Sequence, residues 1–299
     1  IMQTLKGVRH LMTSATMKQA VSEFNMPVPW GEIRGKVWGP DHGRPILCLH
    51  GWADNCGTFN TLIPLLPKEW KCVAVDMAGH GLSSHRPPGV FYSFPAYVAD
   101  IRRVIGALQW KRFSIIGHSM GGNVAGIFSA LYPEMVESVV LLDSYGFLPT
   151  DTELHTVIRQ GFEGMLEFEK KKEKVYTYEN ALMRLLAANP SLSEQSAHIL
   201  LERGLSQVEG GVVFTRDFRI NLVRLIFLIV YVFVFNPPPL PPSLCLSVLY
   251  VSQGMVVNVP GDHHVHLNTP ETVAQLVIDF LQKEAPSHST AEDTQAAKL

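Results

Sequence analysis

The chain has 299 residues, of which 46% are hydrophobic and 17% are charged, and its formal net charge is -2. This length suffices for one large domain with an insertion, or for two modest domains, around a substantial core. A charge so close to zero argues against a protein that binds nucleic acid or acidic surfaces. The cysteines lack the spacing of metal ligands and no secretory signal is visible, so we expect free thiols in a reducing compartment. The four are Cys48, Cys56, Cys72 and Cys245.

Short apolar runs alternate with helical patterns through the first half of the chain. We expect strands at 32–38, 45–49, 71–75, 113–116 and 138–143, and a helix capped by Ser93. Such alternation predicts an α/β fold, a mostly parallel sheet with helices on both faces. Ligands of these sheets bind beyond the carboxyl ends of the strands. Four polar residues fall at those ends, namely His50, Asp76, Ser119 and Asp143.

The strand-like run at 113–116 leads directly into a Gly-x-Ser-x-Gly sequence centred on Ser119, and a helical pattern follows it. A serine on so sharp a strand-to-helix turn is held above the edge of the sheet with its hydroxyl exposed. The crowded backbone of this turn accepts only glycine two residues before and after the serine, at Gly117 and Gly121. The pattern therefore predicts that Ser119 is a nucleophile.

The second half of the chain has a different character. Helical patterns at 153–174, 178–188 and 193–203, the last capped by Gly204, predict a helical lid inserted after the sixth strand. A strand at 255–259 and a helix that begins at Thr269 complete the expected core. The expected divisions are a disordered or leader segment (1–22), a first core part (23–146), the lid (147–219), an anomalous segment (220–254), a second core part (255–283) and a disordered tail (284–299).

The last three residues, Ala297-Lys298-Leu299, are a conservative variant of the Ser-Lys-Leu peroxisomal signal. A polar tail precedes them and would leave them accessible. We therefore expect the peroxisomal import receptor as a partner, with a cytoplasmic location as the alternative.

Four motifs occur in order along the chain. They are His50-Gly-Trp-Ala-Asp-Asn55, Asp76-Met-Ala-Gly-His-Gly-Leu-Ser-Ser-His-Arg-Pro87, Gly117-His-Ser-Met-Gly-Gly122 and Gly261-Asp-His-His-Val-His-Leu267. Together they resemble the α/β-hydrolase superfamily, and within it the serine hydrolase-like proteins, relatives of haloalkane dehalogenases and epoxide hydrolases. The resemblance covers roughly residues 23–219 and 255–283 and implies an α/β-hydrolase fold without a cofactor.

By this resemblance Ser119 attacks an acyl carbonyl, and His263 is the general base that takes the serine proton. The halide- and epoxide-processing relatives carry an aspartate at this elbow, so Ser119 implies ester-type acyl chemistry. The backbone amides of Trp52 and Met120 would form the oxyanion hole. Other motif residues support these loops, namely His50, Gly51, Gly117, His118 and Gly121.

Other polar residues receive simpler interpretations. His80 is expected to order its loop, Asp76 to fix the turn after its strand, and Asp54 to cap a loop. A metal site is not expected at the histidines of the 262–266 loop, because no second cluster of ligands accompanies them.

The third member of a catalytic triad is missing from its usual place. The family carries an acid 25 to 35 residues before the histidine, yet this chain has no acid between Asp217 and Asp262. Asp143, at the end of a strand, is the best substitute, because some superfamily members supply their acid from that position. The alternative is that Asp143 only caps the loop into the lid, and both interpretations stay open.

The interval that lacks an acid has an unusual composition. An apolar run at 225–235 is followed by a proline-rich stretch and then by a second apolar run. The first run is shorter than the roughly 20 residues that span a bilayer, so a membrane anchor is not favoured. Pyrimidine-rich codons encode this set of amino acids, and we therefore hypothesise a retained intron end, a splice variant or a gene-model error.

The sequence thus predicts a serine hydrolase of small hydrophobic esters or related acyl compounds. Its main rival is a catalytically silent relative that binds a ligand or a partner. A third hypothesis is a membrane-associated protein held by residues 222–235.

Overall fold

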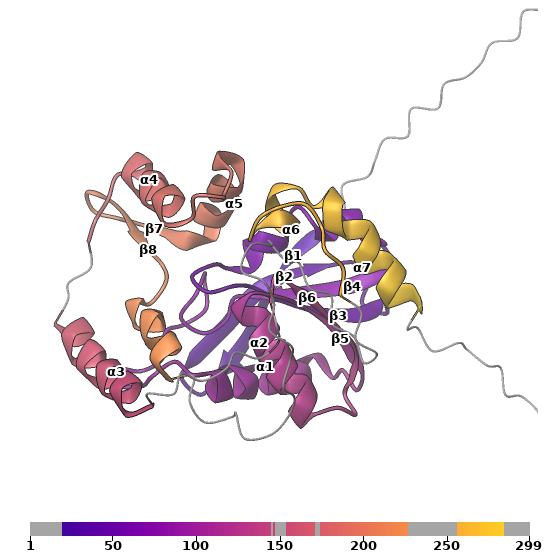
Figure 1. Ribbon diagram of the computed structural model, residues 1–299, viewed down its shortest axis with the longest axis horizontal. Coiled ribbons are helices and arrows are strands. Elements are labelled where there is room, and N and C mark those ends of the chain that lie inside the picture. Colours follow the sequence, from indigo (N-terminus) through magenta and orange to yellow (C-terminus); the bar gives the residue numbers. More distant parts are fainter. Residues whose placement is uncertain (1–19, 145, 147–153, 171–173, 227–255, 284–299) are drawn as a thin grey trace, which may run out of the picture.

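The computed structural model describes residues 20–144, 146, 154–170, 174–226 and 256–283. Six strands form one sheet in the order β1-β2-β4-β3-β5-β6 (Figure 1). The antiparallel hairpin β1–β2 pairs with β4, and the other three pairings are parallel. The strands are β1 (Val21–Val28), β2 (Gly31–Trp38), β3 (Arg44–Leu49), β4 (Trp70–Val75), β5 (Phe113–His118) and β6 (Val136–Leu142).

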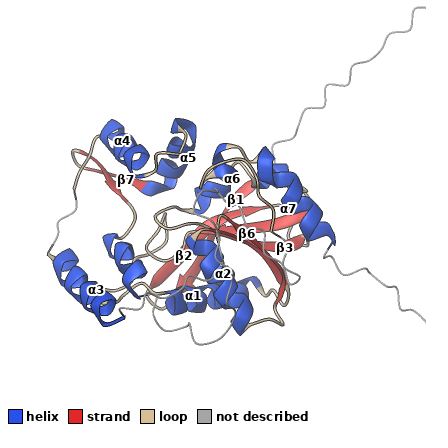
Figure 2. Ribbon diagram, in the orientation of Figure 1, coloured by secondary structure: helices blue, strands red, loops and turns tan. Residues whose placement is uncertain are grey.

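Helices cover both faces of this sheet (Figure 2). Successive side chains of a strand point to opposite faces, so Leu47 and its neighbour Cys48 belong to different layers of the core. Leu47 packs in the cluster formed with α1 (Phe94–Leu108) and α2 (Met120–Leu131), whereas Cys48 packs in the cluster formed with α7 (Glu271–Lys283). The predicted α/β architecture is confirmed. Three short helices complete this part, η1 (Cys56–Phe59), η2 (Ile63–Leu65) and α6 (Val265–Asn268).

Two predicted boundaries of the core are wrong. Strand β1 begins at Val21, inside the segment expected to be a leader, because the hairpin pairs Val21 with Trp38. The strand expected at 255–259 does not form at 256–259. Among the described residues no strand follows β6 in the sheet order, so this apolar run has no described neighbour to pair with. The anomalous interval lies outside the described residues from 227 onward, and its first residues complete η3 (Phe218–Ile226).

The insertion after β6 contains the three expected helices, α3 (Leu154–Glu169), α4 (Tyr178–Ala188) and α5 (Glu194–Gly204). It also contains an unpredicted antiparallel hairpin, β7 (Leu205–Val208) and β8 (Gly211–Phe214). The prediction that Gly204 caps this helix is wrong. Gly204 is the last residue of α5, and the chain passes into extended backbone at Leu205. The elements of the insertion form two groups in Figure 1. The first contains α4, α5 and the β7–β8 hairpin, and in the second α3 packs against η3.

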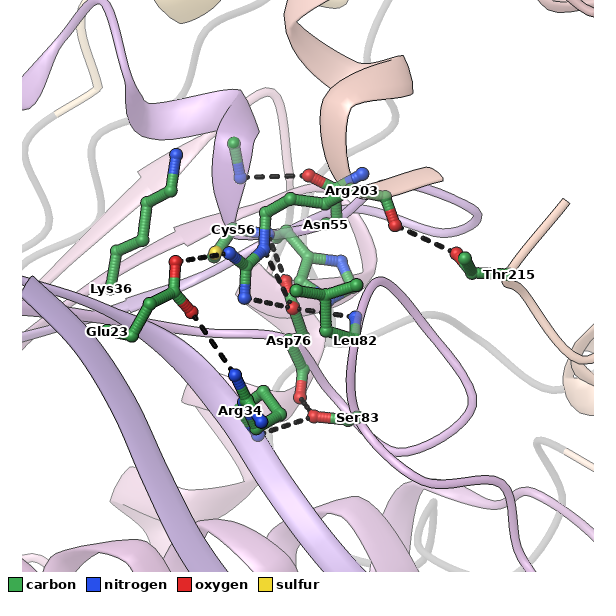
Figure 3. A network of polar contacts seen from close by, with 12 residues as sticks. Glu23, Arg34, Lys36, Asn55, Cys56, Asp76, Leu82, Ser83, Arg203 and Thr215 are labelled. Atoms are coloured by element: carbon green, nitrogen blue, oxygen red, sulfur yellow. Dashed lines mark hydrogen bonds and ion pairs between the residues drawn. The ribbon is translucent and has the colours of Figure 1, made fainter. Parts of the chain in front are cut away.

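A buried ion pair joins the first of these groups to the core (Figure 3). The Arg203 guanidinium of α5, only 4% exposed, donates through Nε and Nη2 to Oδ2 of Asp76, at 3.0 and 2.8 Å. Its Nη1 donates to Glu23 of β1 at 2.8 Å. Asp76 also accepts hydrogen bonds from the amides of Cys56 and Leu82, so one carboxylate ties two core loops to the insertion.

Replacing Arg203 by methionine should leave the Asp76 carboxylate buried without its cation. Removing one partner of a buried pair costs about 3–5 kcal/mol, so we expect a loss of this order in the free energy of unfolding, measured by urea denaturation. The matched control is Arg103→Met, because Arg103 is largely exposed and pairs with Asp100 one helical turn away. That variant should change stability by at most about 1 kcal/mol. Equal losses in the two variants would contradict the proposed anchoring role of Arg203.

Candidate active site

Ser119 occupies a strained turn between β5 and α2. Its backbone has φ 51° and ψ -117°, a conformation that costs a non-glycine residue about 1–3 kcal/mol. The turn is tight because α2 crosses β3 closely. A Cβ at Gly121 would lie 2.1 Å from the carbonyl oxygen of Leu49, and one at Gly117 would lie 2.7 Å from that of Gly121. The serine is half-buried, and its amide donates to the carbonyl of Leu142 at 3.0 Å.

The side chain of Asp143 lies against that of His263. Asp143 directly follows β6 with φ 45°, and its Oδ2 accepts a hydrogen bond from Nδ1 of His263. This contact fixes the imidazole tautomer with its proton on Nδ1, which leaves Nε2 free to accept a proton. The backbone of His263 is held as well, because Nε2 of His118 donates to its carbonyl oxygen at 2.7 Å. His263 therefore lies beside the residue that precedes Ser119.

The two residues expected to supply oxyanion amides lie at the same end of the sheet. Met120 is the first residue of α2, where a backbone amide has no acceptor within the helix. Trp52 lies in the loop after β3, which turns sharply through Ala53 at φ 61°. The indole of Trp52 donates to the carbonyl of Ile220 in η3 at 3.2 Å, so the insertion also contacts this loop.

The supporting histidines are buried and hydrogen-bonded within loops. His50 donates from Nδ1 to the carbonyl of Gly51 at 2.7 Å and accepts at Nε2 from the amide of Met77 at 2.9 Å. Burial lowers the pKa of His50, and it lowers the pKa values of His80 and His266 to about 3, so all three are neutral at pH 7.

Gly51 packs against the ring of His118. A Cβ on this glycine would lie 2.8 Å from Nδ1 of that ring, so a larger residue would displace the loop.

Sequence reasoning missed the position of Asp54, for which it predicted only a loop-capping role. The side chain is 7% exposed and lies among the active-site histidines, 3.5 Å from Nε2 of His264 and 3.7 Å from Nδ1 of His118. Nothing in the local sequence distinguishes this aspartate from a surface one, because its partners are more than 60 residues away.

A small cavity of about 20 Å³ lies between the loop after β3 and the insertion. This volume holds roughly one water molecule, so the cavity does not accommodate an acyl chain in this conformation. Its walls are Ala53, Asp54, Asn55, Gly81, Leu185, Leu200, Leu201, Gly204, Phe214, Thr215 and Arg216.

The described part of the chain lacks two other features. It contains no cluster of three or more His, Cys, Asp or Glu side chains arranged to hold a metal ion. None of its helices has the length and apolar character needed to cross a bilayer. Cys48, Cys56 and Cys72 are buried free thiols, as expected, whereas Cys245 lies outside the described residues.

Known proteins share this fold and much of this sequence. Residues 44–171 match the model of the α/β-hydrolase fold family. The crystal structure of a hypothetical protein from Pseudomonas aeruginosa superposes with a TM-score of 0.71 at 26% identity, covering 87% of this chain and 99% of that one. The thioesterase domain of a curacin biosynthetic pathway superposes with a TM-score of 0.60 at 27% identity, covering 69% of this chain and 74% of that one. The fold class is therefore that of the α/β hydrolases.

A full-length relative specifies the family. The serine hydrolase-like protein of Danio rerio is 56% identical over 315 aligned residues, covering 96% of this chain and 96% of the relative. The chain belongs to the serine hydrolase-like family of α/β hydrolases. Its fold and its sequence identity to this relative make it a hydrolase. Its nearness to haloalkane dehalogenases and epoxide hydrolases stays a prediction.

The close crossing of α2 over β3 predicts the effect of a single methyl group. Gly121→Ala should force α2 away from Leu49, and we expect a loss of about 1–3 kcal/mol in the free energy of unfolding, as for other overpacked sites. Gly106→Ala in α1 is the control, because its Cβ would meet only Arg102 at 3.6 Å. An alanine there should stabilise the helix by up to about 1 kcal/mol. Thermal unfolding of both variants decides the matter, and an unchanged Gly121→Ala would contradict the tight crossing.

Proposed function

We propose that this chain hydrolyses an ester or a related acyl compound, with Ser119 as nucleophile and His263 as general base. The observation that carries the proposal is the hydrogen bond from His263 to Asp143 beside the strained serine turn. A carboxylate on Nδ1 is what a histidine needs to present Nε2 as a base and to remain stable once protonated. The strain at Ser119 supports the same interpretation, because such backbone conformations cluster at functional sites.

The proposed reaction proceeds in two halves. Oγ of Ser119 bonds to the acyl carbon while its proton passes to Nε2 of His263, and the negative charge on the former carbonyl oxygen is stabilised by the amides of Trp52 and Met120. The tetrahedral intermediate then expels the leaving alcohol or thiol, which takes the proton from His263. A water molecule next gives its proton to His263 and attacks the acyl carbon. The serine leaves, recovers that proton, and the carboxylic acid is released.

Asp143 is the proposed third member of the triad. It directly follows β6 with φ 45°, a left-handed conformation that aspartate adopts more readily than most other non-glycine residues. Its carboxylate accepts a hydrogen bond from Nδ1 of His263. These observations favour the triad acid over the capping role that the sequence left open.

The proposed substrates are small hydrophobic ester-like compounds. Two features support acyl chemistry, namely a serine at the strand-to-helix turn and the likeness to a thioesterase domain. We propose that α4, α5 and the β7–β8 hairpin act as a lid, because α5 is anchored over the core by Arg203.

A catalytically silent binding protein is the rival proposal. The absence of an acid between Asp217 and Asp262 favours it, and the contact between Asp143 and His263 argues against it. Peroxisomal import through Ala297, Lys298 and Leu299 remains our proposal for location and partner, and these residues lie outside the described part of the chain. The retained-intron hypothesis and the membrane hypothesis concern residues that also lie largely outside it.

A fluorophosphonate probe tests the nucleophile directly, because it bonds to activated serines. We expect covalent labelling of the wild-type chain at Ser119 and none in Ser119→Ala. Thr58→Ala tests whether loss of another buried hydroxyl has the same effect, and labelling should persist in that variant. A folded wild-type protein that takes no label would favour the silent relative.

The triad acid predicts a second result. Asp143→Asn should keep the shape of the contact but lose its charge and tautomer control, which lowered kcat about 10⁴-fold in a serine protease. We expect a loss of this order in ester hydrolysis, measured with 4-nitrophenyl acetate. Asp279→Asn, on the exposed face of α7, is the control and should retain wild-type activity. Near-normal activity in Asp143→Asn would mean that another group orients His263.

A further inference from the structure

Asp54 places a buried carboxylate where three active-site loops meet. It lies two residues after Trp52, and its Oδ2 finds no hydrogen bond of ordinary length among the described residues. The same oxygen faces His118, which precedes Ser119, and His264, which follows His263. The loops that would supply the nucleophile and the base therefore each place one side chain against this carboxylate, which itself belongs to the loop of Trp52.

The protonation of these side chains follows from their partners. Nε2 of His118 faces the carbonyl of His263, so this nitrogen carries the proton. Burial lowers the pKa of His118 well below its ordinary value, and the ring is therefore neutral. Its Nδ1 then presents a lone pair to Asp54, so a neutral His118 cannot donate a hydrogen bond to the carboxylate.

His264 is the donor that can. Burial alone would lower the pKa of His264, but the nearby carboxylate of Asp54, 3.5 Å from Nε2, outweighs burial and raises it. For Asp54, burial acts to raise the pKa, but the contact with His264 outweighs it and the pKa falls. Both directions describe mutual stabilisation, in which the carboxylate of Asp54 favours the protonated form of His264 and the imidazole favours the ionised form of Asp54.

Other charged and titratable groups face this pair. His50 and His266 act on Asp54 from its own side of the core, and both are neutral. Arg216 acts on Asp54 from the insertion, and both residues line the small cavity. Asp143 and Asp262 act on His264. Among the described residues, the basic groups that face the carboxylate without being made neutral by burial are therefore His264 and, from across the cavity, Arg216.

We propose that Asp54 is a positioning residue, whose contact with His264 holds the loop of Trp52 in register with the loop of His263 around Ser119. The inference rests on the proposed function. The sharp turn at Ala53 and the hydrogen bond from the amide of Asp54 to the carbonyl of Gly51 at 3.3 Å couple the side chain to the amide of Trp52. On the other side, His264 is the next residue after the base. A shift of either loop would move an oxyanion donor relative to the base.

Asp54→Asn is the test, because it keeps the size of the side chain and removes its charge. Misplacing catalytic groups by about 1 Å costs on the order of 10²-fold in rate. We expect kcat for 4-nitrophenyl acetate and the rate of fluorophosphonate labelling to fall between about 10- and 100-fold, with KM changed less than about 3-fold.

The matched control is Asp100→Asn, which neutralises another buried, ion-paired carboxylate in α1. The partners of Asp100 are Arg86 and Arg103, which lie outside the loops of Trp52, Ser119 and His263, so the folded variant should keep wild-type activity although its stability falls.

An NMR titration separates positioning from general stability. In the wild type the ring signals of His264 should titrate above 6.5, and in Asp54→Asn below it, because burial then acts without the carboxylate. If Asp54→Asn fails to fold, His264→Gln and His264→Ala test the same contact. Glutamine can still donate to Asp54, so it should retain several-fold more activity than alanine.

The outcomes are distinct. A wild type that takes no label defeats the proposed function itself. A wild type that is labelled, with Asp54→Asn equal to it in kcat or in the titration of His264, defeats only the positioning role of Asp54. Equal activity of the two His264 variants would defeat it as well.

Discussion

The close contact between the start of α2 and the ends of β3 and β5 is the constraint on which the site depends. Glycines at 117 and 121 let the backbones approach within distances that any side chain would block. The approach bends the chain at Ser119 into a conformation costing about 1–3 kcal/mol, which the surrounding core must supply. Because β5 and the end of β3 are buried between the two layers of the core, the serine is held in place while the residue itself stays half-buried. The rest of the site is arranged around that fixed point.

Carboxylates then organise the loops at this end of the sheet, each through a different partner. Asp76 is buried against Arg203 and two amides, and it connects core loops to the insertion. Asp143 faces the imidazole of His263, and Asp54 faces that of His264. Buried charges persist only when they are paired, so the contacts of the buried Asp76 and Asp54 fix the geometry of the loops that supply them. Charged contacts thus position the loops of the site, and the apolar core supports them.

The sequence predicted the parts of the fold that depend on local pattern. Apolar runs gave the buried strands, and helical periodicity gave α4 to the residue. The β7–β8 hairpin was missed, although its two-residue Glu209-Gly210 loop is a turn signal, because Gly204 was interpreted as a helix cap instead. The strand predicted at 255–259 was wrong for a different reason. An apolar run forms a strand only where another strand pairs with it, and the described residues contain no such partner.

The residues of the candidate site likewise fall into those that a local motif predicts and those that it does not. Ser119 and His263 lie in motifs with local signatures, so their spacing identified them as candidates. Asp143 remained one of two readings, because its partner is 120 residues distant and only the structure brings the pair together. The place of Asp54 among the histidines had no local signature at all. Polar side chains that are distant in the sequence meet only in the folded chain, and no local sequence pattern predicts which of them pair.

The origin of the Asp143 carboxylate at the end of β6 has a consequence for how this protein can change. In the proposed assignment the nucleophile, both oxyanion amides and the acid come from residues 52 to 143, and only the imidazole comes from beyond the unusual interval at 220–254. The first residues of that interval belong to the folded core, because the carbonyl of Ile220 accepts a hydrogen bond from the indole of Trp52. Variation of the chain after residue 226 would therefore leave the proposed nucleophile, acid and oxyanion amides in place, provided that the loop of His263 still reaches the carboxyl ends of the strands.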